Sequence, residues 1–162
     1  MPCACQIPVP NYPENVEWGP LVWTILHGFA QSPNVGIFPG DELREWSRLI
    51  KLTADMLPCD KCREHLTDFM RRRPLTLFSQ SPQLKHTVRT WLWDLHNEVN
   101  VKNDKPIYPF EELSVYSNIN IQDLLWRLDP VIKKAIQING LGFIKYTKWI
   151  GSVKMMRAIL GL

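Results

Sequence analysis

Apolar residues recur along this 162-residue chain at three- and four-residue spacing, which predicts amphipathic α-helices. The pattern begins near Trp18 and runs to the proline- and glycine-rich loop at residues 31–40. Its apolar face is formed by Leu21 or Val22, Trp23, Leu26, His27 and Ala30. The alternation typical of β-strands is scarce, and the chain has no internal repeat. The sequence therefore predicts an all-α fold.

Three more helices follow with short connections. Asp41 is a suitable N-cap for the second, which Pro58 ends because the residue before a proline disfavours the helical conformation. The third is expected from about Cys59 to Arg72 and the fourth from about Gln83 to Lys102. The apolar stripes are Leu43, Trp46, Leu49 or Ile50 and Thr53 in the second helix, and Val88, Trp91 or Leu92, Leu95 and Val99 in the fourth. This pattern predicts a four-helix bundle.

Two regions of different composition flank the bundle. The N-terminal region contains Pro2, Pro8, Pro10 and Pro13, and this proline content predicts an extended arm. Residues 114–162 carry seven Lys or Arg and two acidic residues, whereas the first 113 residues carry a net charge of −2. Extra helices are expected there, at about Ile121–Leu128, from the Asp129-Pro130 pair to about Ile138, and from about Phe143 to Leu160. We divide the chain into an arm (1–17), a helical domain (18–113) and a basic C-terminal extension (114–162).

Composition excludes several classes of protein. A hydrophobic content of 45% with seven Trp and six Phe excludes intrinsic disorder, and no apolar run approaches the length of a membrane span. The first residues lack a basic start and an uninterrupted apolar stretch, so we expect no signal peptide and a cytoplasmic location. A net charge of +3 is too small to indicate a nucleic-acid partner, and four cysteines are too few for a disulfide scaffold.

The strongest local motif is the Cys59-Asp60-Lys61-Cys62 sequence at the expected start of the third helix. The helix N-terminus and the neighbouring basic residues Lys61 and Arg63 favour a reactive thiolate, and two cysteines at this spacing can close a disulfide. The pair could instead be buried structural thiols or half of a zinc site, completed by Cys3 and Cys5 or by His65. Thioredoxin-like chemistry is excluded because that motif follows a strand in a βαβ unit.

Two further helices carry polar residues beside their apolar stripes. Trp23 and His27 lie four residues apart in the first helix, and His96, Asn97 and Asn100 lie on the fourth. Each alone could be a boundary or solvated residue. A buried amide or imidazole costs about 1–3 kcal/mol when it has no partner, however. A bound polar heterocycle would satisfy several of these groups together, with tryptophans as stacking surfaces.

Three motifs in this order and spacing resemble the Erv/ALR family of FAD-linked sulfhydryl oxidases. They are Gly19-x3-Trp23-x2-Leu26-His27, Pro58-Cys59-x2-Cys62, and Trp91-x4-His96-Asn97-x-Val99-Asn100-x-Lys102. The resemblance covers about residues 18–106. It implies a helical bundle that binds FAD non-covalently, and a homodimer usually built from the first two helices. The reaction it implies turns two thiols and O2 into a disulfide and hydrogen peroxide.

The resemblance also implies roles for individual residues. Cys62 would lie next to the flavin, and Cys59 would exchange with the incoming thiol. The FAD-binding residues would be Gly19, Trp23, His27, Cys62, His96, Asn97, Val99, Asn100 and Lys102, with Lys105 close to the phosphates or the adenine. Family members also carry a second redox pair on a terminal arm, so Cys3 and Cys5 are the expected shuttle pair. No metal ligand is implied.

Three departures from the family pattern are visible. Pro20 stands where the cellular enzymes commonly have an arginine, and the regions around Met70 and Phe110 lack the second, structural cysteine pair. The extension after Ser114 lies outside the family core. Small virus-encoded relatives tolerate such changes, so we expect a member of the family from a large DNA virus, located in the host cytoplasm or the virion.

The sequence thus predicts an FAD-dependent thiol oxidase that forms disulfides in a client protein or a small thiol-redox protein, with O2 as the oxidant. The extension is expected to pack on the bundle or on a second subunit. The alternative is that its last helix contacts a membrane surface, since Lys145, Lys148, Lys154 and Arg157 accompany Phe143, Ile144, Trp149 and Ile150. The competing function is a non-enzymatic zinc-binding adaptor that uses Cys3, Cys5, Cys59 and Cys62.

Overall fold

The computed structural model describes residues 11–33, 38–78, 83–139 and 141–162. These residues form α1 (Asn15–Gln31), α2 (Pro39–Met56), α3 (Asp60–Arg72), α4 (Leu84–Lys102), α5 (Ile121–Asn139) and α6 (Phe143–Leu160). Two 3-10 helices, η1 (Leu75–Phe78) and η2 (Phe110–Tyr116), stand on either side of α4 in the sequence. The described residues contain no strand, and the predicted all-α fold is confirmed.

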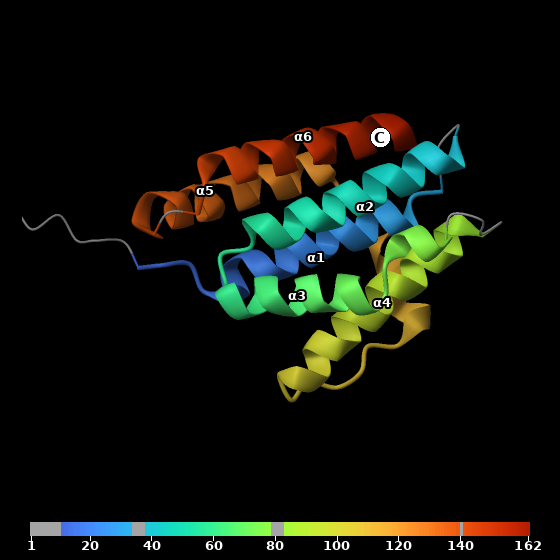
Figure 1. The fold of residues 1–162 in the computed structure, drawn as a ribbon, viewed down its shortest axis with the longest axis horizontal. Coiled ribbons are helices and arrows are strands. Elements are labelled where there is room, and N and C mark those ends of the chain that lie inside the picture. The colour runs from blue at the N-terminus through green and yellow to red at the C-terminus, as the bar shows by residue number, and fades with distance from the viewer. Residues whose placement is uncertain (1–10, 34–37, 79–82, 140) are drawn as a thin grey trace, which may run out of the picture.

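The helices are arranged around α1 and α2, which lie in the middle of the molecule (Figure 1). On one side α3 packs against α2 and α4 against α1, and on the other side α6 packs against α2 and α5 against α1. A continuous apolar core runs through all these contacts, from Trp18 in α1 to Leu160 in α6. The extension is therefore part of the packed molecule, and its predicted packing on the bundle is confirmed.

The start of α2 differs from the prediction. Phe38, in an extended conformation, is the N-cap, and Pro39 is the first residue of the helix. A proline suits this position because its fixed φ is already helical and its missing N–H would have had no partner. Asp41 lies in the first turn instead, where its carboxylate pairs with Arg44. Acidic side chains also stabilise a helix in this turn by interacting with its dipole.

The largest correction concerns α5. The sequence predicts two helices divided at Asp129-Pro130, but the structure contains one helix that continues through Pro130. Leu128 and Ile132, on either side of the proline, are both fully buried. The packing of this one face keeps the helix continuous, although the proline removes a backbone hydrogen bond.

Buried polar contacts join α6 to α2. Trp149 donates its indole N–H to Thr53 Oγ1 at 2.9 Å, and the Ser152 hydroxyl donates to the buried Glu45 carboxylate. Both contacts link the extension to residues about a hundred positions earlier. Trp149, which the membrane alternative would place at a lipid surface, is fully buried, whereas Phe143 and Ile144 are exposed. The described helices include none with the length and apolarity needed to cross a membrane.

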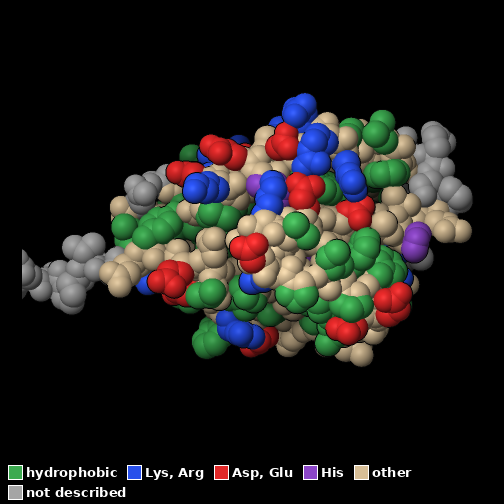
Figure 2. Space-filling view, turned by 90° about the horizontal axis from the view of Figure 1, so that it is seen from below, with side chains coloured by type: hydrophobic (Ala, Val, Ile, Leu, Met, Phe, Trp, Pro, Cys, Tyr) green, Lys and Arg blue, Asp and Glu red, His purple; other side chains and the backbone are tan. Residues whose placement is uncertain are grey.

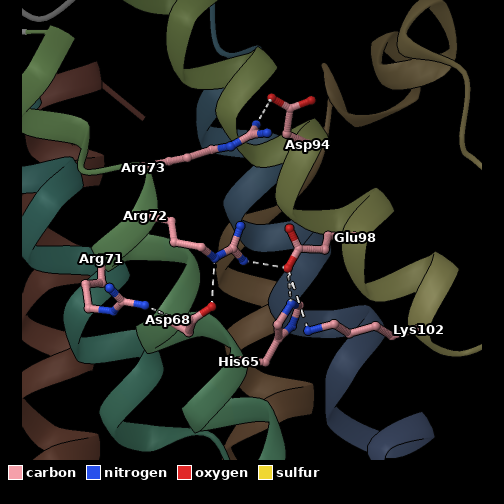
Figure 3. Close-up of polar contacts among 8 residues, drawn as sticks. All are labelled: His65, Asp68, Arg71, Arg72, Arg73, Asp94, Glu98 and Lys102. Carbon is pink, nitrogen blue, oxygen red and sulfur yellow. Dashed lines mark hydrogen bonds and ion pairs between the residues drawn. The ribbon is translucent and has the colours of Figure 1, made fainter.

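Ion pairs connect α3 to α4 (Figure 3). The Glu98 carboxylate contacts His65 Nε2 at 2.6 Å and Arg72 at 2.7 Å, and Arg73 contacts Asp94 at 2.6 Å. Although burial raises the pKa of Glu98, hydrogen bonds from His65 and Arg72 lower it below its usual value.

Figure 2 shows the molecule turned by 90° about the horizontal axis of Figure 1, so that it is seen from below. Acidic and basic side chains alternate over this face with apolar ones between them, and neither sign of charge dominates a broad area. This mixed distribution agrees with the small net charge of +3.

Candidate active site

Cys59 and Cys62 form a disulfide at the start of α3. Cys59 is the N-cap of this helix, and its sulfur accepts a hydrogen bond from the Cys62 backbone N–H at 3.1 Å. Backbone N–H groups at a helix N-terminus have no partner within the helix and favour negative charge nearby. The motif therefore lies where the thiolates released by disulfide cleavage are stabilised.

The first residue of α1 and the segment before this helix lie against the motif. The Tyr12 hydroxyl donates to the Pro58 carbonyl at 2.6 Å, and the Asn15 side-chain amide lies 3.8 Å from Cys62 Sγ and 4.0 Å from Cys59 Sγ. Sequence reasoning missed both residues. Their partners are 44 to 47 positions away, and the sequence contains no local signal for such contacts.

Three predicted site residues form one ring cluster between α1 and α4. The Trp23 and His96 rings stack with centroids 4.0 Å apart, and His27 Nε2 lies 3.1 Å from His96 Nδ1. Tyr116, at the end of η2, stacks on His27 from another side, which the sequence did not indicate. The cluster lies two to three turns along α1 from Asn15 and hence, by helix rise, about 12–18 Å from the disulfide end of this helix.

Both imidazoles in the cluster are neutral at physiological pH. Burial and the adjacent His96 lower the pKa of His27 to about 3, while burial and Lys105 lower that of His96 to about 4. One imidazole therefore donates the shared hydrogen bond and the other accepts it. His27 is fully buried, and its Nδ1 has no hydrogen-bond partner among the described residues. A buried polar atom of this kind indicates a site for a polar group that binds there.

Asn97 connects α4 to the loop that follows this helix. Its amide donates to the Tyr108 carbonyl at 3.2 Å, and its oxygen accepts from the Tyr108 N–H at 2.8 Å and from the Asn100 amide at 3.3 Å. Asn97 thus fastens the loop after α4 to that helix. The same loop carries Lys105, whose backbone N–H donates to the Asn100 carbonyl at 2.9 Å.

The remaining predicted residues lie close to these groups along the chain. Lys102, at the end of α4, is 3.7 Å from Glu98 and more than half exposed. Gly19 and Val99 are partly buried in α1 and α4, and the position of a side chain on Gly19 is open space. Cys3 and Cys5 lie outside the described residues. The site thus offers flat rings, an unpaired buried nitrogen and nearby lysines, which match the aromatic rings and phosphates of a dinucleotide.

The structure also bears on the zinc alternative. His65, the candidate fourth ligand, is hydrogen-bonded to Glu98. The sulfurs of Cys59 and Cys62 are joined to each other, whereas zinc binds cysteine as a thiolate. In the described part of the chain, no three His, Cys, Asp or Glu side chains are grouped as a metal site would require.

A cavity of about 200 Å³ adjoins the cysteine motif. Residues from both ends of the sequence line it, namely Tyr12, Pro58, Asp60, Arg63, Leu141, Gly142 and Lys145. A second hollow of about 470 Å³ shares Arg63 and Lys145 with it and extends between α2 and α3. The C-terminal extension therefore helps to shape the surface next to Pro58 and Cys59.

Comparison with known proteins agrees with the motifs. The model of the Erv1/Alr family matches residues 20–119. An FAD-linked sulfhydryl oxidase of African swine fever virus (isolate Pig/Kenya/KEN-50/1950) is 32% identical over 114 residues, covering 68% of this chain and 85% of the relative. The FAD-linked sulfhydryl oxidase ERV1 of Oryza sativa subsp. japonica is 28% identical over 102 residues, covering 60% of this chain and 47% of the relative.

A probable FAD-linked sulfhydryl oxidase of Acanthamoeba polyphaga mimivirus is 28% identical over 96 residues, covering 59% of this chain and 65% of the relative. No solved structure matches the chain significantly. The resemblance drawn from the three motifs is confirmed, and the chain belongs to the Erv1/Alr family.

Proposed function

We propose that this chain is an FAD-dependent sulfhydryl oxidase, which joins two substrate thiols as a disulfide and reduces O2 to hydrogen peroxide. The observation that carries this function is the Cys59–Cys62 disulfide at a helix N-terminus in a chain of the Erv1/Alr family. Relatives from viruses and plants are named FAD-linked sulfhydryl oxidases, and FAD is accordingly the cofactor.

The protein's own part of the reaction is thiol–disulfide exchange. A substrate thiolate attacks Cys59 Sγ, the bond to Cys62 breaks, and its electron pair leaves on Cys62 Sγ as a thiolate. A second substrate thiolate then attacks the mixed disulfide and releases Cys59. The substrate has lost two electrons and the cysteine pair has gained them. When bound, FAD supplies the redox chemistry that links the reduced cysteine pair to O2.

The residues proposed to hold FAD fall into three groups. Trp23, His27 and His96 supply ring surfaces and the unpartnered His27 nitrogen. Asn97 and Asn100 hold the loop that carries Lys105, and together with Lys102 this loop offers positive charge for phosphates. Gly19, Val99 and Cys62 are carried over from the family motifs alone.

The direct test is to purify the protein and measure its flavin spectrum, its zinc content and its oxidation of a small dithiol. We expect a yellow protein whose flavin survives gel filtration and which produces one hydrogen peroxide for each disulfide. A colourless protein with stoichiometric zinc would instead establish the adaptor function.

Substitution of the cysteines separates redox groups from cofactor-binding groups. We expect Cys59→Ser and Cys62→Ser each to abolish dithiol oxidation while FAD stays bound, because neither variant can form the exchanging disulfide. His96→Ala, in contrast, is expected to lose flavin and to melt at a lower temperature, since ligand binding stabilises the native state. Substantial turnover in either cysteine variant would contradict the proposal.

Cys3 and Cys5 are proposed as the shuttle pair that passes electrons from a client protein to Cys59 and Cys62. Trp18 lies thirteen positions after Cys5 in the sequence, and at about 3.3 Å per extended residue this separation can span about 43 Å. We expect the Cys3→Ser/Cys5→Ser variant to oxidise small dithiols normally but a folded protein thiol slowly. Equal rates on the protein substrate would exclude a shuttle role.

The partners of the oxidase are thiol substrates and O2. From the sequence we propose a client protein or a small thiol-redox protein as the thiol substrate, and a cytoplasmic location. The family also implies a homodimer built on the first two helices, yet here α1 and α2 pack against α5 and α6. We propose that these C-terminal helices take the place of a second subunit.

A further inference from the structure

We propose that Asn15 is a further catalytic residue of the exchange at Cys59 and Cys62, donating a hydrogen bond from its side-chain amide to the sulfur that leaves as a thiolate. The inference rests on the proposed thiol–disulfide chemistry and adds a residue from outside the three family motifs. Asn15 also lies before the region that the family model matches.

The position of the amide is the first argument. Asn15 Nδ2 is nearly equidistant from the two sulfurs, at 3.8 Å from Cys62 and 4.0 Å from Cys59. It can therefore serve whichever sulfur is released. These distances are long, as expected for a neutral disulfide, which is a weak acceptor. A thiolate accepts a shorter and stronger hydrogen bond because it is charged.

The way in which Asn15 is held is the second argument. Asn15 is the first residue of α1, and Glu14 and Glu17 form a reciprocal capping box around it. Three residues earlier, the Tyr12 hydroxyl is bonded to the carbonyl of Pro58, the residue directly before Cys59. The backbone on both sides of Asn15 is thus fixed relative to the disulfide, so little side-chain movement is needed to reach a thiolate.

The chemical step balances without another reactant. The attacking thiolate forms a new bond to one sulfur, the Cys59–Cys62 bond breaks, and the electron pair leaves on the other sulfur. The amide stabilises this charge while keeping its own proton. The neighbouring cation Arg63 is already engaged, because it donates to the Leu57 carbonyl at 2.6 Å and pairs with Asp60.

The test measures the acidity of the reduced cysteines in the full-length protein with its cofactor. After anaerobic reduction, iodoacetamide alkylation of Cys59 and Cys62 is followed against pH by mass spectrometry, residue by residue. A hydrogen bond of ordinary strength at this exposed position implies that Asn15→Ala raises the pKa of the more reactive thiol by about half to one pH unit. Its alkylation at pH 7 then slows about three- to tenfold.

Two variants make the result interpretable. Asn15→Asp keeps a residue favoured in a first helical turn, so α1 is retained, and its negative charge is expected to raise the thiol pKa further than alanine does. Asn11→Ala removes the same type of side chain from an exposed position four residues earlier and is expected to match the wild type. Neither change alters the other charged or titratable groups near the motif. These are Tyr12, Glu14, Glu17 and Lys134 on one side and Asp60, Lys61, Arg63 and Lys145 on the other.

The proposal is overturned if Asn15→Ala and Asn15→Asp both retain the wild-type alkylation profile. The readout is the reactivity of two thiols and does not depend on turnover. A protein that lacks oxidase activity but shows the shifted profiles would refute the proposed function and leave the role of Asn15 intact.

Discussion

The His27–His96 pair shows how burial decides the charge of a single residue. Neither imidazole is protonated in the folded protein near neutral pH, since their pKa values are lowered from 6.5 to about 3 and about 4. A charged imidazole in this cluster would be desolvated and would repel its neighbour. The neutral pair can share one proton in its hydrogen bond and still stack on Trp23 and Tyr116.

This pair predicts a particular pH dependence of stability. Between pH 6.5 and about 4 the unfolded chain binds protons on these imidazoles that the native state does not bind, so the free energy of unfolding falls as the pH falls. The slope is at most about 1.4 kcal/mol per pH unit for each imidazole. Urea denaturation at pH 7.5, 6.5 and 5.5 measures this slope. These pH values lie above the range in which most carboxylates titrate, so carboxylates contribute little to it.

Two variants assign the slope to the pair. His96→Phe keeps a ring against Trp23 but removes one titrating group, so its slope is expected to be smaller. The exposed His86 provides the control, because His86→Gln removes an imidazole that is already in solvent and should leave the slope unchanged. An identical pH slope in His96→Phe and wild type would mean that the buried pair does not control stability.

At the scale of a helix, α5 contains a residue that destabilises the helical backbone. Pro130 lies inside the helix, is exposed and cannot complete the backbone ladder, yet the buried Leu128 and Ile132 hold both halves on one axis. We expect Pro130→Ala to stabilise the protein by about 1–2 kcal/mol, since the cost of an interior proline exceeds its benefit in restricting the unfolded chain.

Pro109 is the matched control, because it is also exposed but lies before η2 with φ −65°, which a proline adopts without strain. Pro109→Ala is therefore expected to lower stability by about 0.4–1 kcal/mol. Thermal unfolding of both variants measures these two changes in stability. A loss of stability in Pro130→Ala would mean that the proline is needed to shape α5, as the predicted division into two helices implied.

At the scale of the whole molecule, the extension determines which surfaces are free. Trp149, Val153 and Met156 of α6 are fully buried, and α6 reaches α2 through the contacts of Trp149 with Thr53 and of Ser152 with Glu45. Separating these helices would expose a large apolar surface together with a buried carboxylate, and both changes are unfavourable.

The proposed substitution of α5 and α6 for a second subunit predicts that the full chain is a monomer. Light scattering coupled to gel filtration should give a mass near 18.9 kDa across a range of micromolar concentrations. The covered faces of α1 and α2 cannot pair with a second copy unless α5 and α6 move away. A stable species of twice this mass would contradict the substitution of α5 and α6 for a second subunit.

Much of the fold could be predicted because it depends on local patterns. The three- and four-residue periodicity located α1, α3, α4 and α6 within a few residues, since each helix buries one face and ends at recognisable residues. The CxxC motif at the start of α3 was evident for the same reason, because Pro58 and the helix pattern place it there. The family membership followed from three motifs in register.

The sequence by itself thus determined most of the helices, the cysteine pair and the family, because those properties are encoded in neighbouring residues. Only the tertiary structure decided that α5 continues through Pro130, that Asn97 binds the loop at Tyr108, and that Asn15 faces the disulfide. It also decided that α5 and α6 cover α1 and α2. The physical reason is that these features depend on burial and hydrogen bonds between distant segments. A contact such as Ser152 with Glu45, 107 residues apart, contributes its free energy only once the chain has folded.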